Sequence, residues 1–177
     1  MRMFLGIPIP SELKDRVWKV STRLPDDGVK RVEYDNLHIT LKFLGEVDER
    51  LKDRIIDNID AVLPEVHPFP LELKGIGFFP NERFVRVIWI GVGKGREEVI
   101  KLSRMIDTSL SSLGFSPEHD YVPHLTIARV KKKIPLNLND VIDQSFGEMT
   151  VNRIVLYQSR LTPKGPIYSE IKSFELR

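Results

Sequence analysis

The chain has 177 residues, with 27 lysines and arginines against 25 aspartates and glutamates. This near balance argues against a strongly basic protein that binds nucleic acid without selectivity, although it leaves room for a local basic groove. The chain has no cysteine, which excludes disulfide frameworks, cysteine-ligated metals and thiol nucleophiles.

The first predicted elements are a strand and a helix. Residues 3–9 are predicted as a strand that stops at Pro10, and they lack the length and cleavage pattern of a signal peptide. No stretch approaches the roughly 18 apolar residues of a membrane span, so we expect a cytoplasmic protein without a membrane partner. Ser11 is predicted to cap a helix. The apolar residues of this helix recur at helical spacing: Leu13, Val17, Val20 and Leu24.

The middle of the chain alternates strand and helix patterns. Residues 37–44 are predicted as a strand, and Asp48 is predicted to cap a second helix. Two further runs, 69–79 and 83–92, surround a proline turn and predict a hairpin. A glycine-rich break follows, and then a third amphipathic helix that Gly114 ends.

The last third of the chain is predicted to be mostly strand. Residues 121–130, 151–161 and 167–176 have strand patterns, with a short helix at 140–144. The whole chain then holds about seven or eight strands and three or four helices. So many strands favour an α+β fold with mainly antiparallel pairing over a doubly wound parallel sheet. We expect residues 1–177 to form a single two-lobed domain.

One pattern occurs twice, about half the chain apart. His38 and Thr40 belong to His-Ile-Thr-Leu, and His124 and Thr126 belong to His-Leu-Thr-Ile. On a strand, residues i and i+2 share a face, so each histidine and threonine point one way and the apolar residues the other. Two pseudo-equivalent halves facing each other would gather two imidazoles and two hydroxyls around one small site.

This set of side chains suits phosphodiester chemistry without a metal ion. One neutral imidazole accepts a proton from a nucleophile, and one protonated imidazole donates a proton to the leaving oxygen. The threonine hydroxyls donate hydrogen bonds to the phosphate oxygens. Lys42 has the spacing to share the face of His38 and Thr40, so we expect it to contact the phosphate as well.

The motifs and their flanks resemble those of the 2H phosphoesterase superfamily, most closely its RNA 2′,3′-cyclic phosphodiesterase branch, also called 2′-5′ RNA ligases. The resemblance covers essentially the whole chain. It rests on the two motif segments and on three flanking segments, residues 38–45, 123–129, 77–80, 86–89 and 156–159.

The resemblance implies a fold and an activity. The fold has two lobes, each a mainly antiparallel sheet with helices on its outer face, and a catalytic groove between the sheets. The activity is metal-independent and cofactor-free opening of a 2′,3′-cyclic phosphate at an RNA end to a 2′-phosphate. Some members also join or cleave 2′-5′ linkages in RNA. We expect the protein to act as a monomer.

The resemblance also implies roles for individual residues. His38 and His124 form the acid–base pair, while Thr40 and Thr126 bind the phosphate and Arg129 assists there. We assign His38 as the acid that protonates the departing 3′ oxygen and His124 as the base that activates water; the sequence fits the reverse assignment as well, and the roles swap for ligation. Strict alternation places Arg129 on the apolar face, so reaching the phosphate requires a bend or bulge of the strand after Ala128.

Two other functions fit part of the pattern. A non-catalytic module that binds RNA ends would keep the same groove, but binding alone needs no paired acid and base. A metal hydrolase would use His38, His124 and a carboxylate, but no HxxE, HxH or DxD spacing supports it. Turnover separates the first alternative from an enzyme, and activity in strong chelator eliminates the second.

Several other residues have more than one interpretation. His67 and His119 are predicted as exposed loop histidines. The lysines at 131–133 form either a solvated loop or a patch that tracks RNA phosphates. Phe43 is predicted either in the core or at the rim, where an aromatic ring stacks a base. Trp89 is predicted to be a packing residue.

Overall fold

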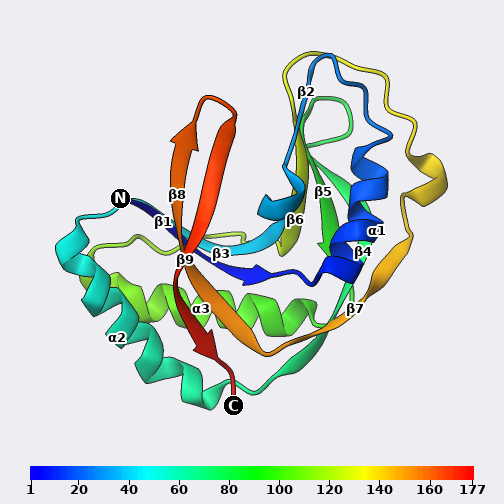
Figure 1. Cartoon of the computed structure of the whole chain (residues 1–177). Helices are drawn as coiled ribbons and strands as arrows, with labels where there is room; N and C mark the ends of the chain where they lie inside the picture. The colour runs from blue at the N-terminus through cyan, green and yellow to red at the C-terminus, as the bar shows by residue number, and fades with distance from the viewer.

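The computed structural model describes residues 1–177 as one nine-stranded sheet with three α-helices (Figure 1). The predicted α+β class is confirmed, with one strand more than expected. The helices are α1 (Ser11–Ser21), α2 (Lys52–Val62) and α3 (Arg96–Leu110). The strands are β1 (Arg2–Pro8), β2 (Val29–Arg31), β3 (His38–Glu46), β4 (Phe69–Pro80), β5 (Val85–Val92), β6 (His124–Val130), β7 (Ser145–Val151), β8 (Arg153–Thr162) and β9 (Gly165–Glu175).

The sheet divides into two halves at one weak junction. Its order is β7-β4-β5-β6-β3-β1-β8-β9, with β2 also paired to β6, and every pairing is antiparallel. Between β6 and β3 only Ile39 and Leu125 pair. From this junction the two halves diverge like the arms of a V (Figure 1). The two expected sheets are therefore halves of one continuous sheet, with a groove opening between them.

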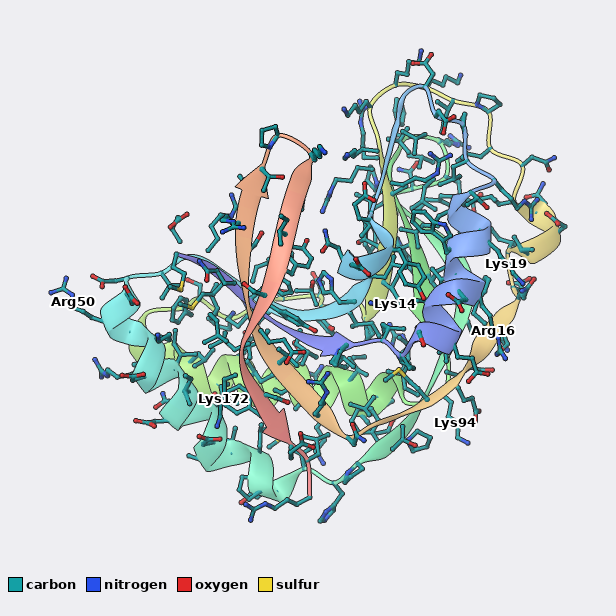
Figure 2. All side chains as sticks on the ribbon, viewed as in Figure 1. Lys14, Arg16, Lys19, Arg50, Lys94 and Lys172 are labelled. Carbon is teal, nitrogen blue, oxygen red and sulfur yellow. The ribbon has the colours of Figure 1, made fainter.

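Helices cover the outer face of each half. α1 packs on β6 and β7, while α3 packs on β3 and is covered in turn by α2. Each helix buries one apolar stripe, and its charged side chains, such as Arg16 and Lys19 on α1, point outward, apart from the buried Asp107 of α3 (Figure 2). Burying each large apolar side chain contributes roughly 1.5–3 kcal/mol, so these stripes fix the helices on the sheet. None of the helices combines the length and the apolar character that crossing a membrane requires.

The predicted helix starts were right in one case and wrong in another. Asp48 is a cap, because its carboxylate accepts a hydrogen bond from the Arg50 amide at 2.9 Å, at the start of a 3₁₀ turn that leads into α2. The prediction that Ser11 caps α1 is wrong. Ser11 is the first helical residue, and Pro10 precedes it without a side-chain cap.

Two of the strands, β2 and β7, are not predicted from the sequence. β2 has only three residues, too few for a period to be read. β7 alternates, but only Phe146 and Val151 are buried, and residues 145–150 are assigned to no element from the sequence. The short helix predicted at 140–144 is a single 3₁₀ turn, Asn139–Val141.

Candidate active site

Both motif strands carry a β-bulge at the same place. In β3 the extra residue is Leu41, and in β6 it is Ile127, each directly after the threonine of its motif. A bulge inserts one unpaired residue, so the alternation of faces shifts by one position beyond it. The pseudo-symmetry of the sequence motif therefore extends to the backbone geometry.

The bulge in β6 turns Arg129 toward the groove. Strict alternation from His124 would place Arg129 beside the buried Leu125. Because Ile127 is the extra residue, Ala128 is buried instead and Arg129 is exposed, lining the same cavity as His124. The required bulge is present, one residue earlier than the sequence argument placed it.

The equivalent bulge in β3 turns Lys42 away from the groove. The Lys42 side chain is only 2% exposed, and its ammonium lies 2.5 Å from the Asp107 carboxylate and donates to the Ser116 carbonyl at 2.8 Å. The prediction that Lys42 faces the phosphate with His38 is wrong, since Lys42 belongs to the core face. Phe43 faces the groove in its place and is 62% exposed.

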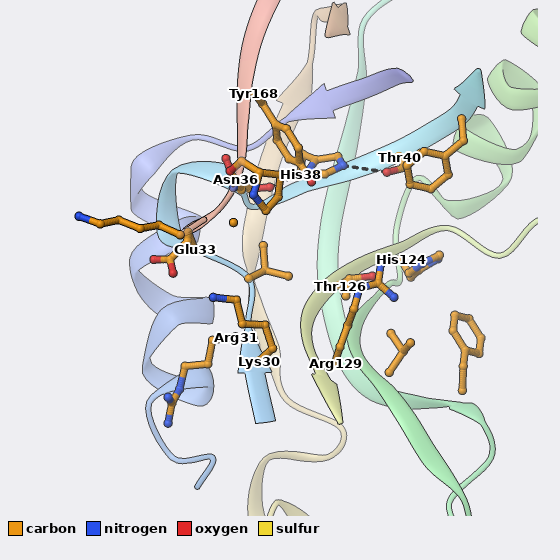
Figure 3. Close-up of a pocket in the computed structure, with 17 residues that line it drawn as sticks. Lys30, Arg31, Glu33, Asn36, His38, Thr40, His124, Thr126, Arg129 and Tyr168 are labelled. Atoms are coloured by element: carbon orange, nitrogen blue, oxygen red, sulfur yellow. Dashed lines mark hydrogen bonds between the residues drawn. The ribbon is translucent and has the colours of Figure 1, made fainter. Parts of the chain in front are cut away.

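Five of the six predicted site residues converge on one cavity. His38 and Thr40 reach it from β3, and His124, Thr126 and Arg129 from β6 (Figure 3). The cavity has a volume of about 450 Å³ and lies in the groove between the two halves of the sheet. Its size matches the lower part of the range for small-molecule sites.

Each imidazole is oriented by a backbone carbonyl two residues earlier. The Nδ1 atom of His38 lies 2.6 Å from the Asn36 carbonyl oxygen, and that of His124 lies 2.6 Å from the Val122 carbonyl oxygen. A carbonyl only accepts, so each Nδ1 carries a hydrogen and each neutral ring has its lone pair on Nε2. This arrangement presents both reactive nitrogens to the cavity.

The two Nε2 atoms differ in their partners. Nε2 of His38 lies 2.7 Å from the Thr40 hydroxyl, which donates to the neutral ring and accepts from the charged one. His124 makes one protein hydrogen bond, through Nδ1, so its Nε2 is open to the cavity. This difference leaves His124 more accessible to a proton from a bound molecule.

Aromatic rings surround both imidazoles. The His38 ring lies 4.8 Å from Phe4 and 5.3 Å, edge-on, from Tyr168, centroid to centroid. The His124 ring lies 5.1 Å from Phe79 and 5.9 Å from Trp89. Trp89 also packs on Phe79 at 4.9 Å, as its predicted packing role requires. These rings shield the imidazoles from water and restrict their rotation.

The same shielding disfavours the protonated imidazoles. Burial lowers the pKa of His38 to about 4. The hydrogen bond to the Asn36 carbonyl raises this pKa, but its effect is smaller than that of burial. Burial also lowers the pKa of His124, although the hydrogen bond to the Val122 carbonyl raises it. The positive charge of Arg129 lowers this pKa further. In the free protein both rings are therefore neutral at pH 7, and acid–base catalysis requires one of them to gain a proton when a phosphate anion binds.

The remaining histidines and the lysine run lie outside the cavity. His67 bonds to the carbonyl of Arg177, and His119 is an exposed loop residue, as predicted. The lysines at 131–133 are exposed, and Lys132 pairs with Asp27. The structure contains no group of three or more histidine, aspartate or glutamate side chains that could hold a metal ion.

Sequence reasoning missed several residues that shape the site. Asn36 orients His38 through its carbonyl, and Phe4 and Tyr168 pack on the same ring. Tyr121 donates its hydroxyl to the Thr40 carbonyl at 2.8 Å, which ties the loop before the second motif to the first motif. The only sequence signal for any of them was position, since Asn36 and Val122 each precede a histidine by two residues.

The fold occurs in solved structures. The Thermus thermophilus protein TT0787 matches with a TM-score of 0.88 at 31% identity, over 100% of this chain and 98% of that chain. E. coli LigT, solved in complex with 3′-AMP, matches in fold with a TM-score of 0.83 at 24% identity, over 99% of this chain and 97% of that chain. Fold and paired motifs together define a phosphoesterase of the two-histidine class.

Sequence comparisons define the family. Residues 10–162 match the family model of the 2′-5′ RNA ligase superfamily. A Methanocaldococcus jannaschii protein named RNA 2′,3′-cyclic phosphodiesterase is 45% identical over 98% of this chain and 100% of its own length. A Methanothermobacter thermautotrophicus protein of the same name is 39% identical over 99% of both chains. The chain belongs to the 2′-5′ RNA ligase superfamily.

Proposed function

We propose that the protein is an RNA 2′,3′-cyclic phosphodiesterase that opens a 2′,3′-cyclic phosphate end to a 2′-phosphate by metal-independent, paired-histidine catalysis. The observation that carries the proposal is the convergence of His38 and His124, each with Nδ1 held by a carbonyl, on one cavity. The names of relatives up to 45% identical support the same substrate. We further propose that it works in the cytoplasm as a monomer.

The proposed reaction needs two proton transfers. His124 accepts a proton from water through its open Nε2 as the water oxygen attacks phosphorus. The bond between phosphorus and the 3′ oxygen breaks, and protonated His38 donates its Nε2 proton to that oxygen. The product carries a 3′-hydroxyl and a 2′-phosphate, and both histidines return to their starting states after one proton exchange with solvent.

The other cavity residues act on the phosphate. The Thr40 and Thr126 hydroxyls and the Arg129 guanidinium are proposed to donate hydrogen bonds to its non-bridging oxygens, where negative charge develops. The phosphate anion in turn favours the protonated form of His38, which the free protein disfavours. With a 5′-hydroxyl of a second RNA in place of water, the same transfers would join the ends by a 2′-5′ linkage.

Product analysis tests the proposal. The purified protein is incubated with a short RNA ending in a 2′,3′-cyclic phosphate, in excess chelator, beside a His124→Ala variant. We expect a 2′-phosphate end from the wild type alone. A 3′-phosphate end would reverse the assigned orientation, and activity lost with the chelator would indicate a metal hydrolase. Retained RNA binding without any product would indicate a binding module.

The pH dependence of turnover follows from the two pKa values. The reactive form of the free enzyme holds one proton on the pair, and it is most populated between the two pKa values. Both pKa values lie below the ordinary 6.5 of histidine, that of His38 at about 4. We therefore expect kcat/KM to peak below pH 6.5 and to fall about tenfold for each pH unit above the higher pKa.

Initial rates at limiting substrate, measured from about pH 4 to pH 9, check this expectation. Because bound phosphate favours a protonated histidine, the falling limb of kcat should lie at higher pH than that of kcat/KM. A kcat/KM value that stays constant up to pH 8 would contradict the assignment of both catalytic groups to these two histidines.

A further inference from the structure

Positive charge is in excess along the cavity that holds the two histidines. Four basic side chains and one acidic side chain, Glu33, contribute to its lining. The basic side chains are Lys30, Arg31, Arg129 and Lys164. The guanidinium of Arg31 is already satisfied, since it bonds to Asp26 and to the carbonyls of Ser21 and Leu24. The other three cations take part in no ion pair.

Two of these unpaired cations lie directly opposite each other in the sheet. Lys30 of β2 is the antiparallel partner of Arg129 of β6, so both side chains extend from the same face (Figure 3). Like charges at directly opposite positions destabilise a sheet. An anion between or beside them would relieve this repulsion. Arg129 lies near enough to His124 to lower its pKa, which leaves Lys30 one strand farther from the reacting phosphate.

The third cation is at the tip of the β8–β9 hairpin. Lys164 occupies its turn, where the Thr162 hydroxyl donates to the Gly165 carbonyl at 2.6 Å and accepts from the Lys164 amide at 3.2 Å. The Asn36 side chain donates to the Pro166 carbonyl at 2.8 Å and ties the tip to the segment that precedes β3. The turn that presents Lys164 is therefore held by hydrogen bonds on both sides.

Lys30 reaches this tip across the mouth of the groove. A methyl group placed on Gly165 would lie 3.9 Å from the Lys30 ammonium nitrogen. Lys30 and Lys164 thus line the same end of the cavity, from the two different halves of the sheet. Neither lysine has an ion-pair partner, and an ammonium group donates hydrogen bonds to a phosphate oxygen.

We infer that Lys30 and Lys164 form a second phosphate subsite, which binds the phosphodiester on the 5′ side of the terminal nucleotide. This inference rests on the proposed function, because it assumes that the cyclic phosphate lies between His38 and His124. The terminal nucleotide of an RNA is joined to the chain through its 5′ oxygen, so the next phosphate lies one nucleotide away. The subsite makes the substrate an RNA strand of two or more nucleotides rather than a mononucleotide.

Kinetics with two substrates test the subsite. A dinucleotide ending in a 2′,3′-cyclic phosphate is compared with adenosine 2′,3′-cyclic phosphate, using wild type, Lys30→Gln, Lys164→Gln and the double variant. We expect the wild type to have the lower KM for the dinucleotide. Each substitution should raise the KM for the dinucleotide, relative to that for the mononucleotide, about fivefold. Lys19→Gln, an exposed lysine without an ion pair on α1, is the matched control.

Salt dependence gives a second readout. Each lysine that contacts a backbone phosphate of single-stranded RNA contributes about 0.7 to the slope of log affinity against log salt. We expect the slope for the dinucleotide to become shallower by about that amount with each substitution, and to stay unchanged in Lys19→Gln. An equal loss on both substrates, or an unchanged slope in the double variant, would overturn the inference.

Binding of the products separates this inference from the proposed function. Calorimetry with a dinucleotide ending in a 2′-phosphate, and with adenosine 2′-phosphate, requires no turnover. If neither cyclic phosphate is hydrolysed but the dinucleotide still binds more tightly, and loses this advantage in the double variant, the proposed activity fails and the subsite remains. Equal dissociation constants for wild type and double variant would reject the subsite itself.

Discussion

His38→Ala and His124→Ala are each expected to lower kcat/KM on a cyclic phosphate by about 10²–10⁴-fold. Each removes a proton donor or acceptor whose Nε2 reaches the cavity, and no other histidine lines the cavity. The double variant should lose little more than either single one, because the two groups act in the same step. Steady-state kinetics on an RNA ending in a cyclic phosphate measures these losses.

The fold is expected to survive both substitutions, because the two rings line a cavity rather than fill the core. Circular dichroism and thermal unfolding check this point. His67→Ala is the matched control, since His67 is exposed and bonds only to the carbonyl of Arg177. Turnover within tenfold of wild type in either single variant, with the fold intact, would remove that histidine from the mechanism.

The sequence placed the two histidines and two threonines correctly on one face of each strand. That placement uses only the two-residue period of a strand, and the period holds from His38 to Thr40 and from His124 to Thr126. The apolar residues between them complete the pattern, since Ile39 is fully buried. The structure adds that β3 and β6 are neighbours in the sheet, which brings the two motifs together. The catalytic roles of the four residues stay predictions.

The two-residue alternation of faces does not continue beyond the threonine of either motif. Lys42 is predicted to face the groove and lies in the core, whereas Arg129, which strict alternation would put on the apolar face, lines the groove through the predicted bulge. Both departures from strict alternation have one cause, the bulged residues Leu41 and Ile127. A bulge depends on how the neighbouring strand pairs, so no local pattern in the strand itself predicts it.

Topology explains the other omissions. Phe4 and Tyr168, which pack on His38, come from opposite ends of the chain and meet only because β1 and β8–β9 are neighbours in the sheet. Lys30 lies on a three-residue strand that has no readable period. Each contact depends on strand order, which the composition and periodicity of single segments do not contain.

The core position of Lys42 gives the largest expected effect of a substitution on stability. Lys42 and Asp107 form a buried ion pair, with side chains 2% and 9% exposed. Both also hold the loop that precedes the second motif, because Lys42 donates to the Ser116 carbonyl and Asp107 accepts from the Glu118 amide at 3.1 Å. Removing one partner leaves the other charge buried without compensation.

Lys42→Met is therefore expected to lower the free energy of unfolding by about 3–5 kcal/mol, and Asp107→Leu by a similar amount. The double variant should recover most of this loss, because an apolar pair of similar volume needs no compensation. Urea unfolding of the four proteins gives the coupling energy between the two residues. Lys94→Met is the control, since Lys94 lies on the outer surface 3.8 Å from Glu148 and should change stability by less than about 1 kcal/mol (Figure 2).

Activity and stability should separate in the double variant. Its apolar pair cannot replace the hydrogen bonds to Ser116 and Glu118, so the loop that carries Val122 loses two anchors. The Val122 carbonyl fixes Nδ1 of His124, and a looser loop should lower kcat even where the free energy of unfolding is restored. If the double variant regains wild-type stability and wild-type kcat together, the ion pair serves the core alone, and the loop needs no anchoring to orient the histidine.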